Sequence, residues 1–214
     1  MNQNNQNTNQ APTNTNIVSL KKGQKVSLKK TAMDAGVNSN LTAVKVGLGW
    51  DINRFDGSNF DLDVFAFALK NDGKVRDESD FVFFNNMKIK EGSIVLSGDN
   101  RSGQGQGDDE AVNVDLANLP MEIEKIAFCI TINDAETKNQ NFGMVDNAYV
   151  RFVDQNSNQE FLRYDLSEDY SLETALVVGE LYKHNNEWKF RAIGSGYQAG
   201  LVALCAEYGV SATN

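Results

Sequence analysis

The chain has 214 residues, of which 29 are acidic and 20 basic, giving a formal net charge of −9, and 41% of its residues are hydrophobic. An acidic chain is repelled by phosphate backbones, which argues against non-specific nucleic-acid binding and against a strongly basic membrane-surface protein. No apolar run approaches the roughly 18 residues of a membrane span, and the N-terminus lacks the pattern of a signal peptide, so we expect a cytoplasmic protein.

The first sixteen residues, MNQNNQNTNQAPTNTN, contain ten Asn or Gln residues and no charge. Such a stretch buries too little apolar surface to offset the entropy of ordering it, which predicts a disordered tail over residues 1–16. Residues 17–214 are predicted to form a single folded domain. Its first feature is a repeated Ser-Leu-Lys-Lys at 19–22 and 27–30, which predicts two short paired edge strands whose lysines discourage association.

The remaining pattern is mainly β. Asp63–Leu69 and Lys74–Phe84 flank Asn71-Asp72-Gly73, a hairpin signal. Further strands are predicted at Ala43–Trp50, Ser93–Leu96, Val112–Leu116, Glu124–Ile132, Ala148–Val153, Glu160–Leu166, Ala175–Lys183 and Glu187–Ile193. Only Gly200–Tyr208 has clear helical spacing. Many short strands separated by polar turns predict a β-sandwich with a short C-terminal helix.

Residues that often carry catalysis or bind zinc are scarce. Cys129 and Cys205 lie in apolar runs, which favours buried, reduced thiols over a structural disulfide. His184, the only histidine, falls in a predicted turn and is expected to be exposed, which argues against a zinc site and against a histidine-based triad. Trp50 and Trp188 are interpreted as core or rim residues. We therefore expect a protein that is not an enzyme.

The sharpest chemical signal is the acidic, glycine-rich segment Gly98–Glu110. Ca²⁺ takes six to eight oxygen ligands, and glycines let the backbone turn its carbonyls inward, so this segment offers both ligand types. It is not an EF-hand, because Arg101 and Gln104 stand where that loop needs an oxygen ligand and a glycine. No Gly-Lys-Ser/Thr follows the glycines, which excludes a phosphate-binding loop. Calcium binding and a solvated surface turn remain open as alternatives.

Two further segments offer oxygen ligands. Asp61 and Asp63 are two residues apart, which on a strand makes either a metal clamp or a costly like-charge pair. Asn85 and Asn86 end another predicted strand with two carboxamides. Because loops at one end of a sandwich cluster, the three segments are predicted to converge on one or two ions. The acidic groups within 77–80 and 134–136 are interpreted as ordinary turns.

Long stretches of the chain closely resemble the TerD family of bacterial tellurite-resistance and general stress-response proteins. The stretches that carry the resemblance include VGLGWDINRFDGSNFDLDVFAF, LSGDNRSGQGQGDDE and INDAETKNQNFGMVDNAYVRF, and it extends over residues 17–210. It implies a β-sandwich that binds Ca²⁺, two ions in our expectation, through acidic loops. Matched residue by residue, it implies metal ligands at Asp61, Asp63, Asn85, Asn86, Asp99, Asn100, Asp108, Asp109 and Glu110, with backbone oxygens near Gly103 and Gly105.

The expected function is that of a non-enzymatic calcium-binding stress-response protein, in which Ca²⁺ orders the acidic loops into a face that docks a partner. The resemblance implies other Ter-type stress proteins as partners, including ones at the inner membrane. The alternative is a Ca²⁺-dependent membrane-surface module, in which Phe55 and Phe60 insert and the basic segment 1–49 adds attraction. A third hypothesis, an enzyme acting on a tellurium oxyanion, lacks a reactive thiol pair.

Overall fold

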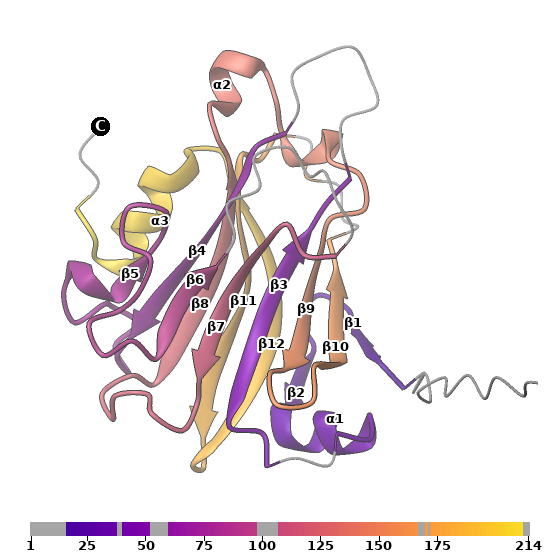
Figure 1. Ribbon diagram of the computed structural model, residues 1–214. Coiled ribbons are helices and arrows are strands. Elements are labelled where there is room, and N and C mark those ends of the chain that lie inside the picture. Colours follow the sequence, from indigo (N-terminus) through magenta and orange to yellow (C-terminus); the bar gives the residue numbers. More distant parts are fainter. Residues whose placement is uncertain are drawn as a thin grey trace, which may run out of the picture.

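The computed structural model describes residues 16–37, 40–51, 60–97, 107–166, 170 and 172–211. In this part of the chain, two six-stranded sheets pack face to face and a short C-terminal helix lies against one of them (Figure 1). The predicted mainly β class and the β-sandwich with a C-terminal helix are confirmed. The predicted tail lies outside the described residues as far as Thr15.

The first sheet has the strand order β1-β10-β9-β3-β7-β6. Its strands are β1 (Val18–Leu20), β10 (Gln159–Asp165), β9 (Tyr149–Asp154), β3 (Ala43–Gly49), β7 (Glu110–Asp115) and β6 (Ile94–Ser97). Strand β1 pairs parallel with β10, whereas the other neighbours are antiparallel. The sheet therefore brings β3 beside β7, the strand that follows the acidic segment.

The second sheet is antiparallel, with the order β2-β12-β11-β8-β4-β5. Its strands are β2 (Lys25–Ser27), β12 (Glu187–Tyr197), β11 (Ala175–His184), β8 (Lys125–Ile132), β4 (Leu62–Leu69) and β5 (Phe81–Val82). Helices α1 (Leu28–Asp34), α2 (Ala135–Lys138) and α3 (Gly200–Tyr208) and the 3₁₀ turns η1 (Glu78–Asp80) and η2 (Phe142–Met144) complete the described elements.

Apolar side chains are buried in two layers. Between the sheets, Phe152 packs against Phe190 with ring centroids 4.5 Å apart, and both side chains are fully buried. On the outer face of the second sheet, Phe67 packs against Tyr208 of α3 at 4.6 Å. Strand β4 has a core on each side, which explains its nearly continuous apolar sequence.

The prediction for the N-terminal repeat is only partly right. Strands β1 and β2 each lie at the edge of a sheet, as predicted, but they do not pair with each other, because β1 joins the first sheet and β2 the second. The second copy of the repeat begins α1 instead of continuing as a strand. Ser27 caps this helix by accepting a hydrogen bond from the Lys30 N–H at 3.1 Å, and Leu28, Thr31 and Ala32 bury one helical face.

The predicted hairpin after β4 is only partly right. Gly73 adopts a φ of 79° and its N–H reaches the Lys70 carbonyl at 3.0 Å, so the turn is present. The predicted strand Lys74–Phe84 contains only β5, preceded by η1. The interpretation of Asp80 as part of an ordinary turn is wrong, since its side chain is 0% exposed and paired with Arg76.

The hairpin between β11 and β12 agrees with the prediction. Asn185 and Asn186 both have positive φ, 53° and 58°, which is the conformation that a tight two-residue hairpin turn requires. His184 is exposed beside them, as expected. Trp50 is buried and Trp188 packs against the core as a partly buried residue.

Both cysteines are free and buried, which confirms the expected reduced thiols. Burial raises the pKa of the Cys129 thiol and of the Cys205 thiol, so little thiolate forms near neutral pH. We expect neither thiol of the native protein to react with an aromatic disulfide reagent at pH 8 within minutes, and both to react after denaturation. The absorbance of the released thiolate measures this, and rapid labelling of either cysteine in the native protein would contradict it.

Candidate functional site

The acidic residues gather where three strands begin or end, at the upper end of the sandwich in Figure 1. Strand β3 ends at Gly49, while β4 and β7 begin at the same end. Leu48 pairs with Glu110 across the first sheet, and the Asp109 N–H donates to the Leu48 carbonyl at 2.8 Å. The Val64 N–H of the second sheet donates to Glu110 Oε2 at 2.7 Å, so this carboxylate joins the two sheets.

The side chains of the three consecutive acidic residues 108–110 point in three different directions. Glu110 points between the sheets and is 5% exposed. Asp109 turns toward the end of β3, where its Oδ2 accepts a hydrogen bond from the Trp50 N–H at 3.0 Å. Both carboxylates therefore accept a hydrogen bond from a backbone N–H, which favours a negative charge. The separation also reduces their mutual repulsion.

Asp108 lies instead over the outer face of the first sheet, where two cations hold it. Arg151 donates to its two carboxylate oxygens from Nε at 2.6 Å and from Nη2 at 3.2 Å, and Lys45 Nζ lies 2.7 Å from Oδ2. Arg151 Nη1 also donates to Glu160 at 2.8 Å. The counter-charge that the acidic run requires is therefore supplied at Asp108 by protein side chains.

Glycine in β3 makes room for this arrangement. A Cβ added to Gly47 would lie 2.2 Å from the Asp108 Cγ, so any larger residue would displace the carboxylate. The hydroxyl of Tyr149 donates to the Gly107 carbonyl at 2.9 Å, and Arg163 stacks on the Tyr149 ring at 3.7 Å. The segment leading into β7 is thus fastened to the outer face of the first sheet.

The other described candidates take separate positions. Asp61 accepts a hydrogen bond from Asn133 Nδ2 at 3.0 Å, next to the start of β4. Asp63 pairs with Thr131 and has the strand parity of Phe65, which packs in the outer cluster of the second sheet. Glu110 contacts β4 at the next residue, through the backbone N–H of Val64. Asp63 and Glu110 are therefore close along β4, although the Asp63 side chain belongs to the outer face.

The two predicted carboxamides lie in the turn after β5. Asn86 Nδ2 donates to the Phe81 carbonyl at 2.7 Å and to the Ser79 carbonyl at 3.2 Å, which closes the turn, while Asn85 is exposed. The remaining predicted ligands lie outside the described residues; they are Asp99, Asn100, Gly103 and Gly105. The structure thus places five acidic candidates at one end of the sandwich and Asn86 in a structural role.

The donor set has the right chemistry for Ca²⁺, since carboxylate and amide oxygens are its preferred ligands. Within the ranges that the structure describes, no three His, Cys, Asp or Glu side chains are grouped so that they could hold a metal ion. The described acids therefore fit a calcium site as contributors to it. Asp108 fits least well, because cations already contact both of its oxygens.

Lys45 and Arg151 are the functional residues that sequence reasoning missed. Each is a basic residue at an alternate position within an otherwise apolar strand, Lys45 in AVKVGLG and Arg151 in YVRFVD. A basic side chain on the same face of two neighbouring strands indicates that an acidic group lies over that face. The acidic segment Gly98–Glu110 is the part of the sequence that could supply this group.

A mainly antiparallel two-sheet sandwich with an acidic end defines the class of this protein, and the comparisons with known proteins name the family. The TerD domain family model matches residues 17–208, and the chain belongs to this family of tellurium-resistance and general stress-response proteins. The chain is 54% identical to General stress protein 16U of Bacillus subtilis (strain 168) over 194 residues, which cover 90% of this chain and 97% of that protein.

A second relative and a solved structure support the same family and fold. The chain is 50% identical to the Tellurium resistance protein TerD of Serratia marcescens over 196 residues, covering 92% of this chain and 99% of that protein. The crystal structure of a homologue of the telluride resistance protein TerD from Streptomyces coelicolor A3(2) superposes with a TM-score of 0.65 at 25% identity. That match covers 81% of this chain and all of the other, so the sandwich is shared.

The described helices are short. Among the residues that the structure covers, no helix is both long and apolar enough to cross a bilayer. Helix α3, the longest of them, has nine residues.

Proposed function

We propose that this chain is a non-enzymatic, cytoplasmic calcium-binding protein of the tellurium-resistance and general stress response. Its acidic end would bind Ca²⁺, two ions in this proposal, and so order a face that docks other Ter-type stress proteins, some of them associated with the inner membrane. The observation that carries the proposal is the arrangement of strand ends. It places Asp61, Asp63, Asp109 and Glu110 at the end of the sandwich from which residues 52–59 and 98–106 depart.

Electrostatics support a cation at this end. Asp108 pairs with Lys45 and Arg151, whereas Asp109 and Glu110 accept hydrogen bonds from backbone N–H groups, which carry no net charge. A carboxylate has about four lone-pair sites, so it can accept a hydrogen bond and bind a metal ion at the same time. The proposal assigns the remaining ligands to Asp99, Asn100 and the backbone near Gly103 and Gly105.

Burial favours a protein partner over a membrane. Phe60, which the membrane alternative would insert into the bilayer, is 2% exposed and packs in the core, so that part of the alternative is wrong. Phe55 lies outside the described residues. A non-enzymatic role is supported by the single histidine, which is exposed in the β11–β12 hairpin at the opposite end of the sandwich (Figure 1).

Calorimetric titration of the chelator-treated protein tests the proposal. We expect Ca²⁺ to bind with measurable heat and to raise the thermal midpoint, because a ligand that binds only the folded state stabilises it. Mg²⁺ should bind more weakly, since it demands tight octahedral geometry. The substitution Asp63→Asn should weaken Ca²⁺ binding about tenfold or more, because it removes one ligand charge.

Asp72→Asn is the matched control, since Asp72 is an exposed aspartate in the turn beyond the far end of β4. It should bind Ca²⁺ as the wild type does. Absence of heat and an unchanged midpoint with Ca²⁺ would refute the calcium site. Co-elution with a purified Ter-type stress protein in Ca²⁺ but not in chelator would support docking, and calcium-independent co-elution would refute the ordered face.

A further inference from the structure

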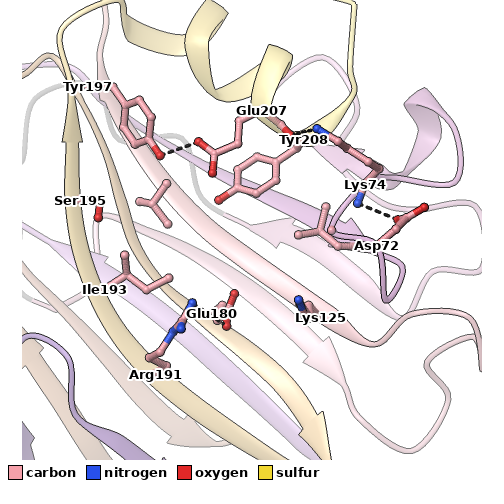
Figure 2. A pocket seen from close by; sticks show the side chains of 13 residues that line it. Asp72, Lys74, Lys125, Glu180, Arg191, Ile193, Ser195, Tyr197, Glu207 and Tyr208 are labelled. Atoms are coloured by element: carbon pink, nitrogen blue, oxygen red, sulfur yellow. Dashed lines mark hydrogen bonds and ion pairs between the residues drawn. The ribbon is translucent and has the colours of Figure 1, made fainter.

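A second surface feature lies on the outer face of the second sheet, beside α3. It is a groove of about 390 Å³, lined by side chains from α3, from β8, β11 and β12, and from the turn after β4 (Figure 2). Helix α3 covers the upper part of this face with Leu204, Cys205 and Tyr208. Below the helix the same face carries Lys125, Glu180 and Arg191, so the groove has a charged floor.

The acidic residues of the groove already have partners. Glu180 pairs with Arg191 Nη2 at 3.0 Å. Glu207 accepts a hydrogen bond from the Tyr197 hydroxyl, which Figure 2 shows at the upper edge of the groove. Asp72 pairs with Lys70 Nζ at 2.9 Å and accepts from the Lys74 N–H at 3.0 Å. The charges of Glu180 and Asp72 are therefore compensated by basic side chains, whereas the hydroxyl partner of Glu207 is neutral.

Among the described residues, Lys125 and Lys74 have no carboxylate partner, whereas Arg191 pairs with Glu180. The Lys125 ammonium, which Figure 2 shows rising from the floor, has no ion-pair or hydrogen-bond partner among the described residues. Lys74 Nζ donates to the Glu207 backbone carbonyl and not to a carboxylate. Arg191 Nε is buried and lacks a hydrogen-bond partner. A buried donor without an acceptor is unfavourable, so this set of donors favours an acceptor.

We infer that the groove is a binding site for a small oxyanion, either a carboxylate or an inorganic oxyanion, held chiefly by Lys125 and Lys74. An oxyanion offers several acceptor oxygens and can form a charge-assisted hydrogen bond to an ammonium group. The Ser195 hydroxyl and the Arg191 guanidinium line the same space and can donate as well. The neighbouring Glu180 and Glu207 restrict the ligand to a small one of low charge, because a polyanion would meet their repulsion.

The test is a titration of the full chain with acetate, inorganic phosphate and tellurite at constant ionic strength, followed by amide chemical shifts. Tellurite is included because relatives of this chain are named for tellurium resistance. We expect at least one anion to shift signals of Lys125 and Ser195, and Lys125→Gln to weaken that binding about tenfold or more, as expected for the loss of a charged hydrogen bond.

Lys29→Gln is the matched control, because it removes the same charge from an exposed position on α1. It should leave the affinity unchanged. Binding of acetate alone identifies an organic carboxylate as the ligand, and binding of phosphate or tellurite an inorganic oxyanion. Equal affinity of Lys125→Gln and wild type, or no binding of any of the three anions, would overturn the inference. Chelator is present throughout, so the result is independent of calcium.

Discussion

Replacement of Arg76 by methionine is expected to lower the free energy of unfolding by about 3–5 kcal/mol, the usual cost of leaving one member of a buried ion pair without its partner. Arg76 donates hydrogen bonds from Nε and Nη2 to the two carboxylate oxygens of Asp80, each at 2.7 Å, and the Asp80 side chain is 0% exposed. Arg76 also binds Glu91 with two hydrogen bonds, at 3.0 and 3.1 Å. Chemical denaturation measures the change.

A second substitution separates charge from packing in this prediction. Adding Asp80→Asn to Arg76→Met should recover part of the loss, because the buried group is then neutral. Lys70→Met is the control. Lys70 and Asp72 form an exposed pair at 2.9 Å, for which the expected loss is within about 1 kcal/mol. A loss for Arg76→Met as small as that of Lys70→Met would show that Asp80 finds another partner or solvent.

Replacement of Arg151 by methionine should lower the free energy of unfolding by about 2–4 kcal/mol. This loss is somewhat smaller than that expected for Arg76→Met, because Lys45 still faces Asp108. The Asp108 side chain is only 6% exposed, and Glu160 loses its 2.8 Å partner in the same variant. We also expect faster amide hydrogen exchange at residues 107–110, since Asp108 fastens this segment to the first sheet. Denaturation and exchange mass spectrometry together measure both effects.

Arg163→Met is the matched control on the same face. Arg163 has a surface ion pair with Asp165 at 2.8 Å and stacks on Tyr149, so its loss should cost no more than about 1–2 kcal/mol. The decisive comparison is with Asp108→Asn. If Arg151→Met and Asp108→Asn destabilise additively in the double variant, the two side chains do not act as a pair.

Much of the fold was predictable from local sequence. The apolar sequences of β4 and β8 predict these strands, and the Asn185-Asn186 turn predicts the hairpin between β11 and β12. The N-terminal repeat was not predictable in this way. Identical tetrapeptides take different structures because Ser27 stands before residues that can bury a helical face, whereas the first copy adds to the edge of β10.

The candidate site was also only partly predictable from the sequence. The sequence shows that residues 98–110 are acidic and glycine-rich and therefore need a counter-charge. It does not show that Lys45 and Arg151, 63 and 43 residues away from Asp108, supply one. Nor does it show that Glu110 turns inward to Val64. Such contacts depend on which strands become neighbours and on which face each side chain lies.

By itself the sequence determined the class of fold, the family, the net charge of −9 and the oxygen-rich chemistry of the acidic segment, because these follow from composition, periodicity and resemblance. Only the tertiary structure decided how that charge is distributed. It separates Asp108, Asp109 and Glu110, and it gathers Lys74, Lys125 and Arg191 around a groove on the opposite sheet. The physical reason is that electrostatic pairing acts over a few ångströms in space, and strand order and register bring distant residues within that range.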